Sequence, residues 1–327
     1  MPVLTPNAEP TGAHARLTGG LLLMSGAMVF LPAMDAVAKA AAAHVSPGQI
    51  TWARFAFQAL FTLPLLVAGE GWRAVVPNRI GMNLLRGCVI ALSSCLFFAA
   101  IKYMPLADAL AIFFVEPFIL TLMAPLVEQE RLGWRRMTAV AVGFSGALIV
   151  IRPSYSVFGA VSLLPLAAAA GFALYLAMSK RFASFDTPRS MQFTAGVGGT
   201  LMMTAVLAIG SMVGVNDMVP TLGTPAVWGM LAIVGLFSTV GHLMVTAAFH
   251  RAPAGVLAPF QYLEIAGATV YGYLLFGDFP DFWKWVGIAI IVGSGSYVFW
   301  RESRSAPGAE RLSPAPGTAS LAVGRED

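Results

Sequence analysis

Ten long apolar runs divide this chain, and they limit the folds that it can adopt. A helix needs about 20 mostly apolar residues to cross a bilayer, and each run is close to that length. Only 11% of the residues are charged, against about 25% in soluble domains. The runs cover residues 18–41, 49–69, 82–101, 105–126, 134–151, 158–179, 191–214, 225–249, 254–276 and 282–300. They predict an all-α membrane protein with ten transmembrane helices.

Basic residues outside these runs indicate the orientation of the helices. Lys and Arg concentrate in the cytoplasmic loops of membrane proteins. If the N-terminus is cytoplasmic, 15 basic residues fall on the cytoplasmic side and only Lys102, Arg152 and Lys284 fall on the other. Both termini are therefore predicted to lie in the cytoplasm. The tails 1–17 and 303–327 are rich in Pro, Gly, Ala and charge, a composition that predicts disorder.

The two halves of the chain carry a weak internal repeat. The segment "AAIKYMPLADALAIFFVEPFI" aligns with "AAFHRAPAGVLAPFQYLEIAG" at a shift of 148 residues. The alignment brings Pro105 onto Pro253 and Glu116 onto Glu264. Each half, 18–152 and 158–301, then holds five spans. Because five is odd, the second half is inverted relative to the first, an arrangement that places transporter sites near the bilayer midplane.

Glu116 and Glu264 are predicted to lie at the same depth. Each is about eleven residues into its span, and the two spans enter the membrane from opposite sides. Eleven residues of helix measure about 16 Å, which is about half of a hydrocarbon core about 30 Å thick. A charged carboxylate there costs at least a few kcal/mol. One interpretation is a binding or proton-coupling site, since a carboxyl group away from water can hold a proton. The other is a neutral carboxyl group bonded to a helix carbonyl that a proline has freed.

Several motifs then point to a known family. They are "MDAVAK", "WARFAFQ", "PLADALAIFFVEPFILTL", "GWRRMTAVAVGFSGALIVIRP", "HRAPAGVLAPFQYLEI" and "LLFGDFPDFWKWVGIAIIVGSGSYVFWRE". Over residues 18–302 the chain resembles the drug/metabolite transporter superfamily, EamA type. The resemblance implies a bacterial inner-membrane carrier without ATP hydrolysis or a cofactor, with spans four and nine lining a central cavity. It also implies substrates such as amino acids, related metabolites, drugs, S-adenosylmethionine or riboflavin.

Three further charges lie inside the predicted spans. Asp35 and Lys39 are four residues apart, and so share a helix face. Arg54 lies about five residues into span two, counted from the same side of the membrane. They form a candidate charge-paired cluster that could hold a zwitterionic substrate or gate the outer mouth. The alternative is a structural ion pair, with Lys39 reaching outward to water.

Polar and aromatic side chains flank the acidic positions and complete the candidate site. Gln261 and Tyr262 adjoin Glu264 and carry polar ends. Trp52, Gln58 and Phe113 are the remaining candidates, and an aromatic wall would suit a planar or amphipathic solute. For each of them ordinary helix packing is the alternative.

Four other residues receive structural roles. Asp108, near the outer N-terminus of its span, is expected to act on the dipole of that helix, and Arg86 is expected to anchor the cytoplasmic interface. His242 and His250 are expected to be hydrogen-bonded structural histidines rather than proton relays. No pair of Cys and His residues has metal-ligand spacing, so no metal is expected.

These observations predict a secondary transporter of a small polar or amphipathic organic metabolite that works by alternating access. The expected partners are the substrate, membrane lipid and protons as coupling ions, and no nucleic acid is expected. Formation of a homodimer is left open by the sequence. One rival is a membrane scaffold or sensor that moves no solute. The other is an intramembrane serine protease using Ser145 of "GFSG" with His242 as its base, although small residues recur in the equivalent span and favour close helix packing.

Overall fold

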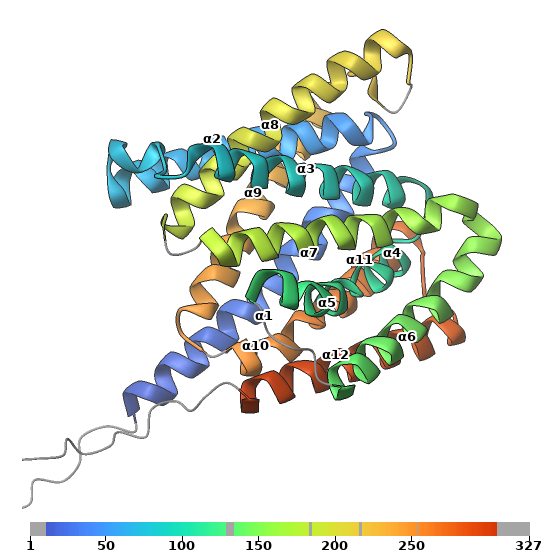
Figure 1. Ribbon diagram of the computed structural model, residues 1–327. Helices are drawn as coiled ribbons and strands as arrows, with labels where there is room; N and C mark the ends of the chain where they lie inside the picture. Colours follow the sequence, from blue (N-terminus) through green and yellow to red (C-terminus); the bar gives the residue numbers. More distant parts are fainter. Residues whose placement is uncertain (1–10, 129–133, 183–184, 216–217, 253, 306–327) are drawn as a thin grey trace, which may run out of the picture.

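The computed structural model describes residues 11–128, 134–182, 185–215, 218–252 and 254–305 (Figure 1). All regular elements in these ranges are helical. The α-helices are α1 (Thr11–Ala41), α2 (Pro47–Glu70), α3 (Ile80–Tyr103), α4 (Leu106–Phe113), α5 (Glu116–Glu128), α6 (Trp134–Phe158), α7 (Leu164–Phe182), α8 (Pro188–Val213), α9 (Pro225–Phe249), α10 (Ala254–Gln261), α11 (Leu263–Phe276) and α12 (Phe282–Ser305). Two 3₁₀ helices, η1 (Trp72–Val75) and η2 (Gly159–Leu163), join them. Residues 11–17 and 303–305, expected in disordered tails, are helical, and the rest of both tails lies outside the described residues.

The predicted all-α membrane class is confirmed. In the described part of the chain, seven helical segments are long and apolar enough to cross a bilayer, and two shorter apolar helices accompany them. The seven are Arg16–Ala41, Pro47–Glu70, Ile80–Tyr103, Leu106–Met123, Ser154–Ser179, Pro188–Val213 and Pro225–Phe249. The shorter helices, Met137–Ile151 and Leu263–Phe276, belong to two of the remaining expected spans.

Three of the long helices begin with the same local signal, a hydroxyl residue followed by proline. The side chains of Ser46, Thr187 and Thr224 each accept a hydrogen bond from the backbone N–H three residues later, at the starts of α2, α8 and α9. Such a cap satisfies an N–H that has no partner within the helix, and proline suits the first helical position. At the other end, Gly214 and Gly277 close α8 and α11 with φ of 78° and 73°, a conformation that glycine adopts readily.

Helix packing in the two halves follows one plan. α1 packs on α9, and its counterpart α7 packs on α3. In the same way α2 packs on α9 as α8 does on α3, and α1 packs on α11 as α7 does on α5. The pairs α2–α8 and α6–α12 each join a helix to its own counterpart. Exchanging the two halves therefore preserves these helix pairs.

Each half also contains a broken helix. The sequence predicted one span over 105–126 and one over 254–276, and the structure divides each of them into two helices. α4 and α10 are eight residues long, and the bounds of α10 are those of α4 shifted by 148 residues. Phe114 and Val115 separate α4 from α5, and Tyr262 separates α10 from α11. The matching breaks are the strongest local evidence that the sequence repeat is structural.

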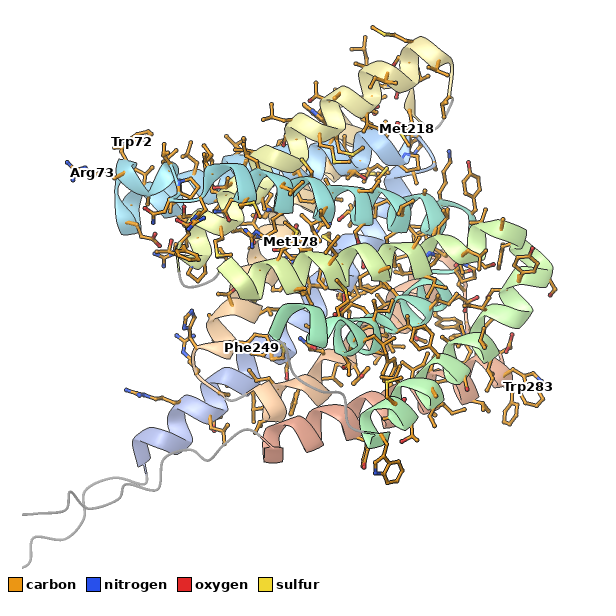
Figure 2. The ribbon with its side chains drawn as sticks, in the orientation of Figure 1. Trp72, Arg73, Met178, Met218, Phe249 and Trp283 are labelled. Carbon is orange, nitrogen blue, oxygen red and sulfur yellow. The ribbon has the colours of Figure 1, made fainter. Side chains whose placement is uncertain are left out.

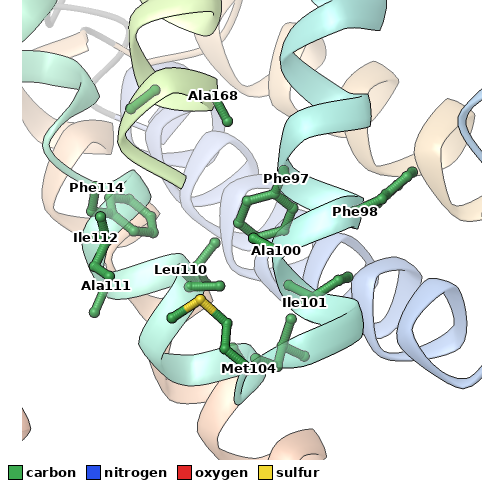
Figure 3. Packing of buried hydrophobic residues seen from close by; sticks show 14 of the residues in the cluster. Phe97, Phe98, Ala100, Ile101, Met104, Leu110, Ala111, Ile112, Phe114 and Ala168 are labelled. Atoms are coloured by element: carbon green, nitrogen blue, oxygen red, sulfur yellow. The ribbon is translucent and has the colours of Figure 1, made fainter. Parts of the chain in front are cut away.

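Apolar side chains from distant segments fill the space around the first break. In Figure 3, Phe97 of α3 and Leu110 of α4 point toward the space between the two helices, Ile101 lies beside it, and Phe98 and Ile112 point away from it. All five are buried. This packing holds α4 in place against α3, and it fixes the position of the break relative to the neighbouring helices.

The bundle has two ends, which the labelled side chains mark. Trp72 and Arg73 of η1 lie at one end of the molecule, and Trp283 at the start of α12 lies at the other (Figure 2). Here they are named the Trp72 end and the Trp283 end. The helix breaks lie between them.

Candidate functional site

Acidic residues lie within electrostatic range of one another where α1 passes the two helix breaks. Glu116 lies in the first turn of α5, and Glu264 lies in the first turn of α11. The charges of Asp35 on α1 and of Glu116 both act on Glu264. Asp35 in turn interacts electrostatically with Arg54 on α2. Four residues that are far apart in the sequence thus form one interior cluster, which we call the central cluster.

Two buried polar atoms beside the breaks have no hydrogen-bond partner among the described residues. They are Glu116 Oε1 and the hydroxyl of Tyr262. The two residues interact electrostatically, and the ring of Tyr262 packs on that of Phe114 with 5.2 Å between centroids. Leaving a buried polar group unpaired costs about 1–3 kcal/mol. Groups of this kind in a folded protein call for an explanation such as a bound ligand or ion.

Arg54 is held in the interior by neutral groups. Its Nε donates to Ser238 Oγ at 3.1 Å, and its Nη1 donates to Ser94 Oγ. Ser238 Oγ also donates to Gln58 Oε1 at 3.2 Å, while Gln58 Nε2 donates to the carbonyl of Gln192 at 3.1 Å. Within the described ranges no carboxylate lies within ion-pair distance of Arg54, which is only 6% exposed. Its positive charge is therefore positioned by hydroxyls and is not cancelled by a direct ion pair.

Lys39 was expected to lie in a cluster with Asp35 and Arg54, but it does not join the central cluster. Its Nζ forms an ion pair with Asp278 Oδ2 at 2.7 Å and donates to the carbonyl of Met104 at 3.1 Å. The ammonium also lies 4.7 Å from the centroid of the Phe276 ring. The predicted Asp35–Lys39 pair is absent because Lys39, in the last turn of α1, meets the segment between α11 and α12.

A second ion pair lies at the same end of the bundle. Lys284 Nζ lies 2.6 Å from Asp108 Oδ2 and 3.7 Å from Asp281 Oδ2. The Asp108 side chain is only 1% exposed. Asp108 does lie in the first turn of α4, as its predicted dipole role requires, but its partner was not predicted from the sequence. The signal was available, since Asp108 and Lys284 were both assigned to the outer side.

Both ion pairs at the Trp283 end connect the two halves of the chain. Lys39 and Asp108 belong to the first half, and Asp278 and Lys284 belong to the second. Opening this end would separate oppositely charged groups that are mostly shielded from water.

The remaining predicted site residues lie in packing contacts or at the break. Trp52 Nε1 donates to Thr204 Oγ1 at 2.9 Å, which joins α2 to α8. The ring of Phe113 contacts those of Phe97 and Phe172, with centroids 5.3 and 5.4 Å away. Gln261 is the last residue of α10 and is half-buried, directly before the second break.

Arg86 was predicted to anchor the cytoplasmic interface, and this prediction was wrong. The residue is buried, at 3% exposure. Its Nη1 donates to Ser179 Oγ at 3.0 Å, and its guanidinium carbon lies 5.2 Å from the centroid of the Tyr175 ring. Ser179 of α7 and the carbonyl of Met191 in α8 both accept from this guanidinium, which lowers the cost of burying its charge.

The serine protease arrangement is not formed. Ser145 Oγ donates to the carbonyl of Ala141 in its own helix at 2.9 Å. His242 Nδ1 donates to the carbonyl of Ser238 at 2.8 Å, which agrees with a structural histidine. Among the described residues no group of three or more His, Cys, Asp or Glu side chains could hold a metal ion.

Residues 18–152 and 159–300 match the family model described as "EamA-like transporter family". The chain belongs to this family. EamA membership makes the protein a multi-pass membrane transporter and not an enzyme. The family's substrates differ from member to member, so the relatives are needed for the chemical class of the solute.

Three EamA relatives cover most of this chain. A riboflavin transporter of Brucella anthropi is 29% identical over 254 residues, covering 78% of this chain and 88% of the relative. The pseudopaline exporter CntI of Pseudomonas aeruginosa is 28% identical over 284 residues, covering 84% and 94%. An S-adenosylmethionine uptake transporter of Rickettsia bellii is 25% identical over 286 residues, covering 88% and 94%. Each of them is similar to this chain over more than three quarters of its length.

A solved crystal structure shares the fold of this EamA chain. The two align with a TM-score of 0.56 at 19% sequence identity, covering 87% of this chain and 98% of the other. The likeness concerns the arrangement of helices alone.

Proposed function

We propose that the protein is a secondary active transporter that moves a small polar or amphipathic organic metabolite across a bacterial inner membrane by alternating access. Its ten spans form two inverted halves, residues 18–152 and 158–301, with both termini in the cytoplasm. The exchange of helix contacts between the halves supports the repeat. An odd number of spans in each half and the distribution of basic residues support the inversion.

The observation that carries the proposal is the pair of unpartnered polar atoms at the helix breaks. Glu116 Oε1 and the Tyr262 hydroxyl are buried without hydrogen-bond partners in the described part of the chain, and Glu264 and Asp35 lie within electrostatic reach of this region. Transporter sites of the inverted-repeat type are built from broken helices near the midplane. A substrate that bonds to these groups would recover the free energy that their burial costs.

The central cluster offers both signs of charge to a substrate. Arg54 attracts an anionic group, and the three carboxyl groups attract a cationic group or take up protons. This combination suits solutes with both donors and acceptors. Riboflavin, S-adenosylmethionine and pseudopaline come first as candidates because relatives carry those names, and amino acids remain candidates from the sequence. The relatives include importers and an exporter by name, so both directions are to be measured.

Alternating access gives the two ion pairs at the Trp283 end a role. With both pairs formed, the halves are held together at that end, which the basic-residue count assigns to the outer side. Binding at the central cluster would favour their separation while the Trp72 end closes. Transfer of a proton to Glu116 or Glu264 would neutralise a carboxylate in the interior and so couple the movement to a pH gradient.

Flux measurements in proteoliposomes test the proposal. Labelled riboflavin, S-adenosylmethionine and amino acids are supplied in turn, with and without a pH gradient. We expect accumulation of one of them by the native protein, and at least a tenfold loss in the double variant Glu116→Gln/Glu264→Gln. Glu70→Gln is the matched control, because Glu70 pairs with Arg189 away from the central cluster at 3.8 Å. Full flux by the double variant would refute the role of these two carboxyl groups.

A further inference from the structure

A groove outside the central cluster lies between α6 and α12. These two helices run side by side at one edge of the molecule (Figure 1). The groove has a volume of about 520 Å³, and its lining includes Trp134, Ala139 and Val142 from α6 with Gly293 and Tyr297 from α12. It therefore opens to the surroundings of the bundle and not to the proposed transport path.

The floor of the groove is apolar and open. Ala139 is 6% exposed, and Ser294 is 9% exposed. The Ser294 hydroxyl is turned onto its own helix, donating to the carbonyl of Ile290 at 2.6 Å. A side chain added at Gly293 would meet no atom within 4 Å. A polar solute would gain little from such a surface, whereas a hydrocarbon chain would lose nothing on entering it.

One end of the groove combines aromatic residues with positive charge. Trp134 and Tyr297 are 71% and 42% exposed at this end, and such residues are typical of the membrane–water interface. Gly146 of α6 lies against Gly287 of α12, so the start of α6 and the end of α12 come together. Arg135 and Arg136 follow Trp134, while Arg301 and Arg304 lie in the last turns of α12 with Glu302 between them.

We propose that this groove binds an anionic phospholipid, with an acyl chain along its floor and the headgroup beside the helix ends that carry these four arginines. Basic clusters at the ends of transmembrane helices attract anionic lipids, and these four arginines outnumber the one acidic residue among them. A second copy of the chain is a poorer occupant, because a twofold contact would bring the same arginines of two copies together. The site is separate from the central cluster and does not depend on which metabolite is carried.

Lipid retention measured by native mass spectrometry tests this site. The purified protein is mixed with vesicles of equal parts dioleoylphosphatidylglycerol and dioleoylphosphatidylcholine, then returned to detergent. We expect at least fivefold more phosphatidylglycerol than phosphatidylcholine on the native protein. Gly293→Leu should fill the groove and lower the retained phosphatidylglycerol at least fivefold. Gly229→Leu is the matched control, since Gly229 of α9 also has no atom within 4 Å of an added side chain.

A second variant tests the headgroup and does not alter the packed part of the groove. Arg135→Gln with Arg301→Gln should reduce the preference for phosphatidylglycerol by about fivefold for each arginine replaced. Equal retention of the two lipids by the native protein would overturn the proposal, as would undiminished retention by Gly293→Leu. A dimer mass in the native protein that Gly293→Leu removes would also overturn it, in favour of a second copy in the groove.

Discussion

The ion pair between Lys284 and Asp108 gives the sharpest test of how the two halves are held together. The perturbation is Lys284→Met, which keeps most of the length of the side chain and removes its charge. Asp108, whose side chain is 1% exposed, would then keep a carboxylate that the protein shields from water. Asp281 cannot replace the lysine, because it is itself acidic.

The magnitude follows from the geometry of the pair. Opposite charges 2.6 Å apart attract by about 6 kcal/mol at an effective dielectric constant near 20. Desolvation of both groups offsets part of this attraction. Removing one partner of a buried pair typically costs about 3–5 kcal/mol, and we expect a loss of that size in the free energy of unfolding. Replacing both partners, in Lys284→Met/Asp108→Asn, should cost less than the sum of the two single changes by about 3 kcal/mol.

A double-mutant cycle measures this coupling. Equilibrium unfolding in mixed micelles of dodecyl maltoside and SDS, followed by tryptophan fluorescence, gives the free energy of unfolding of each variant. Arg251→Met is the control, since the exposed Arg251 guanidinium donates to the carbonyl of Ala247, four residues earlier, at 3.2 Å, a bond worth about 1 kcal/mol. A coupling below about 0.5 kcal/mol, the limit for independent sites, would refute the claim that this pair joins the halves.

Two further changes test the interior. Arg54→Lys should reduce flux at least tenfold and destabilise the fold by about 1–3 kcal/mol, because an ammonium cannot reproduce the fork that donates to Ser94 and Ser238. The control, Arg189→Lys at the exposed Trp72 end, should leave both measurements unchanged. An Arg54→Lys variant that transports normally would contradict this role. Pro117→Ile should keep at least half of the native flux and lower the free energy of unfolding by less than about 1.5 kcal/mol. The flux is measured in the same vesicles and the unfolding in the same micelles. Loss of transport would show that the proline itself is required.

The sequence was enough to predict the helical membrane class and the correspondence between the halves. Apolar runs of the required length are visible without any knowledge of tertiary contacts. The shift of 148 residues, found from a few identities such as Glu116 and Glu264, also relates the bounds of α4 to those of α10. These features are local or repeated, and for that reason a single sequence reveals them.

The partners of buried charges could not be predicted in the same way. The spacing of Asp35 and Lys39 favours a local pair, yet Lys39 bonds to Asp278, 239 residues away in the chain. Arg86 looked like an interface residue because helix ends often carry arginine. Its actual partner, Ser179, is supplied by a helix of the other half. Which acceptors a long side chain finds depends on helices brought together by packing, and no local pattern records that.

The helix breaks explain how carboxyl groups are tolerated inside this protein. Pro117 lacks an N–H and follows Glu116 directly, which suggests that the proline makes the first break. The second break occupies the matching position without such a proline, because Ile265 stands there and donates its N–H to the carbonyl of Tyr262 at 3.1 Å. What the breaks share is an acidic residue in the first turn of the helix that follows.

A helix that begins inside the protein presents unpaired N–H groups and the positive end of its dipole. Such an end stabilises a nearby negative charge by about 0.3–1 kcal/mol at exposed sites and up to about 2 kcal/mol in favourable buried ones. The break therefore lowers the free-energy cost of burying a charged carboxylate next to it, whichever residue causes the break. In Pro117→Ile the new amide can donate to the carbonyl of Phe114, as Ile265 does to Tyr262. We expect transport to survive for this reason, since the protein needs the helix start beside Glu116 and not the proline ring.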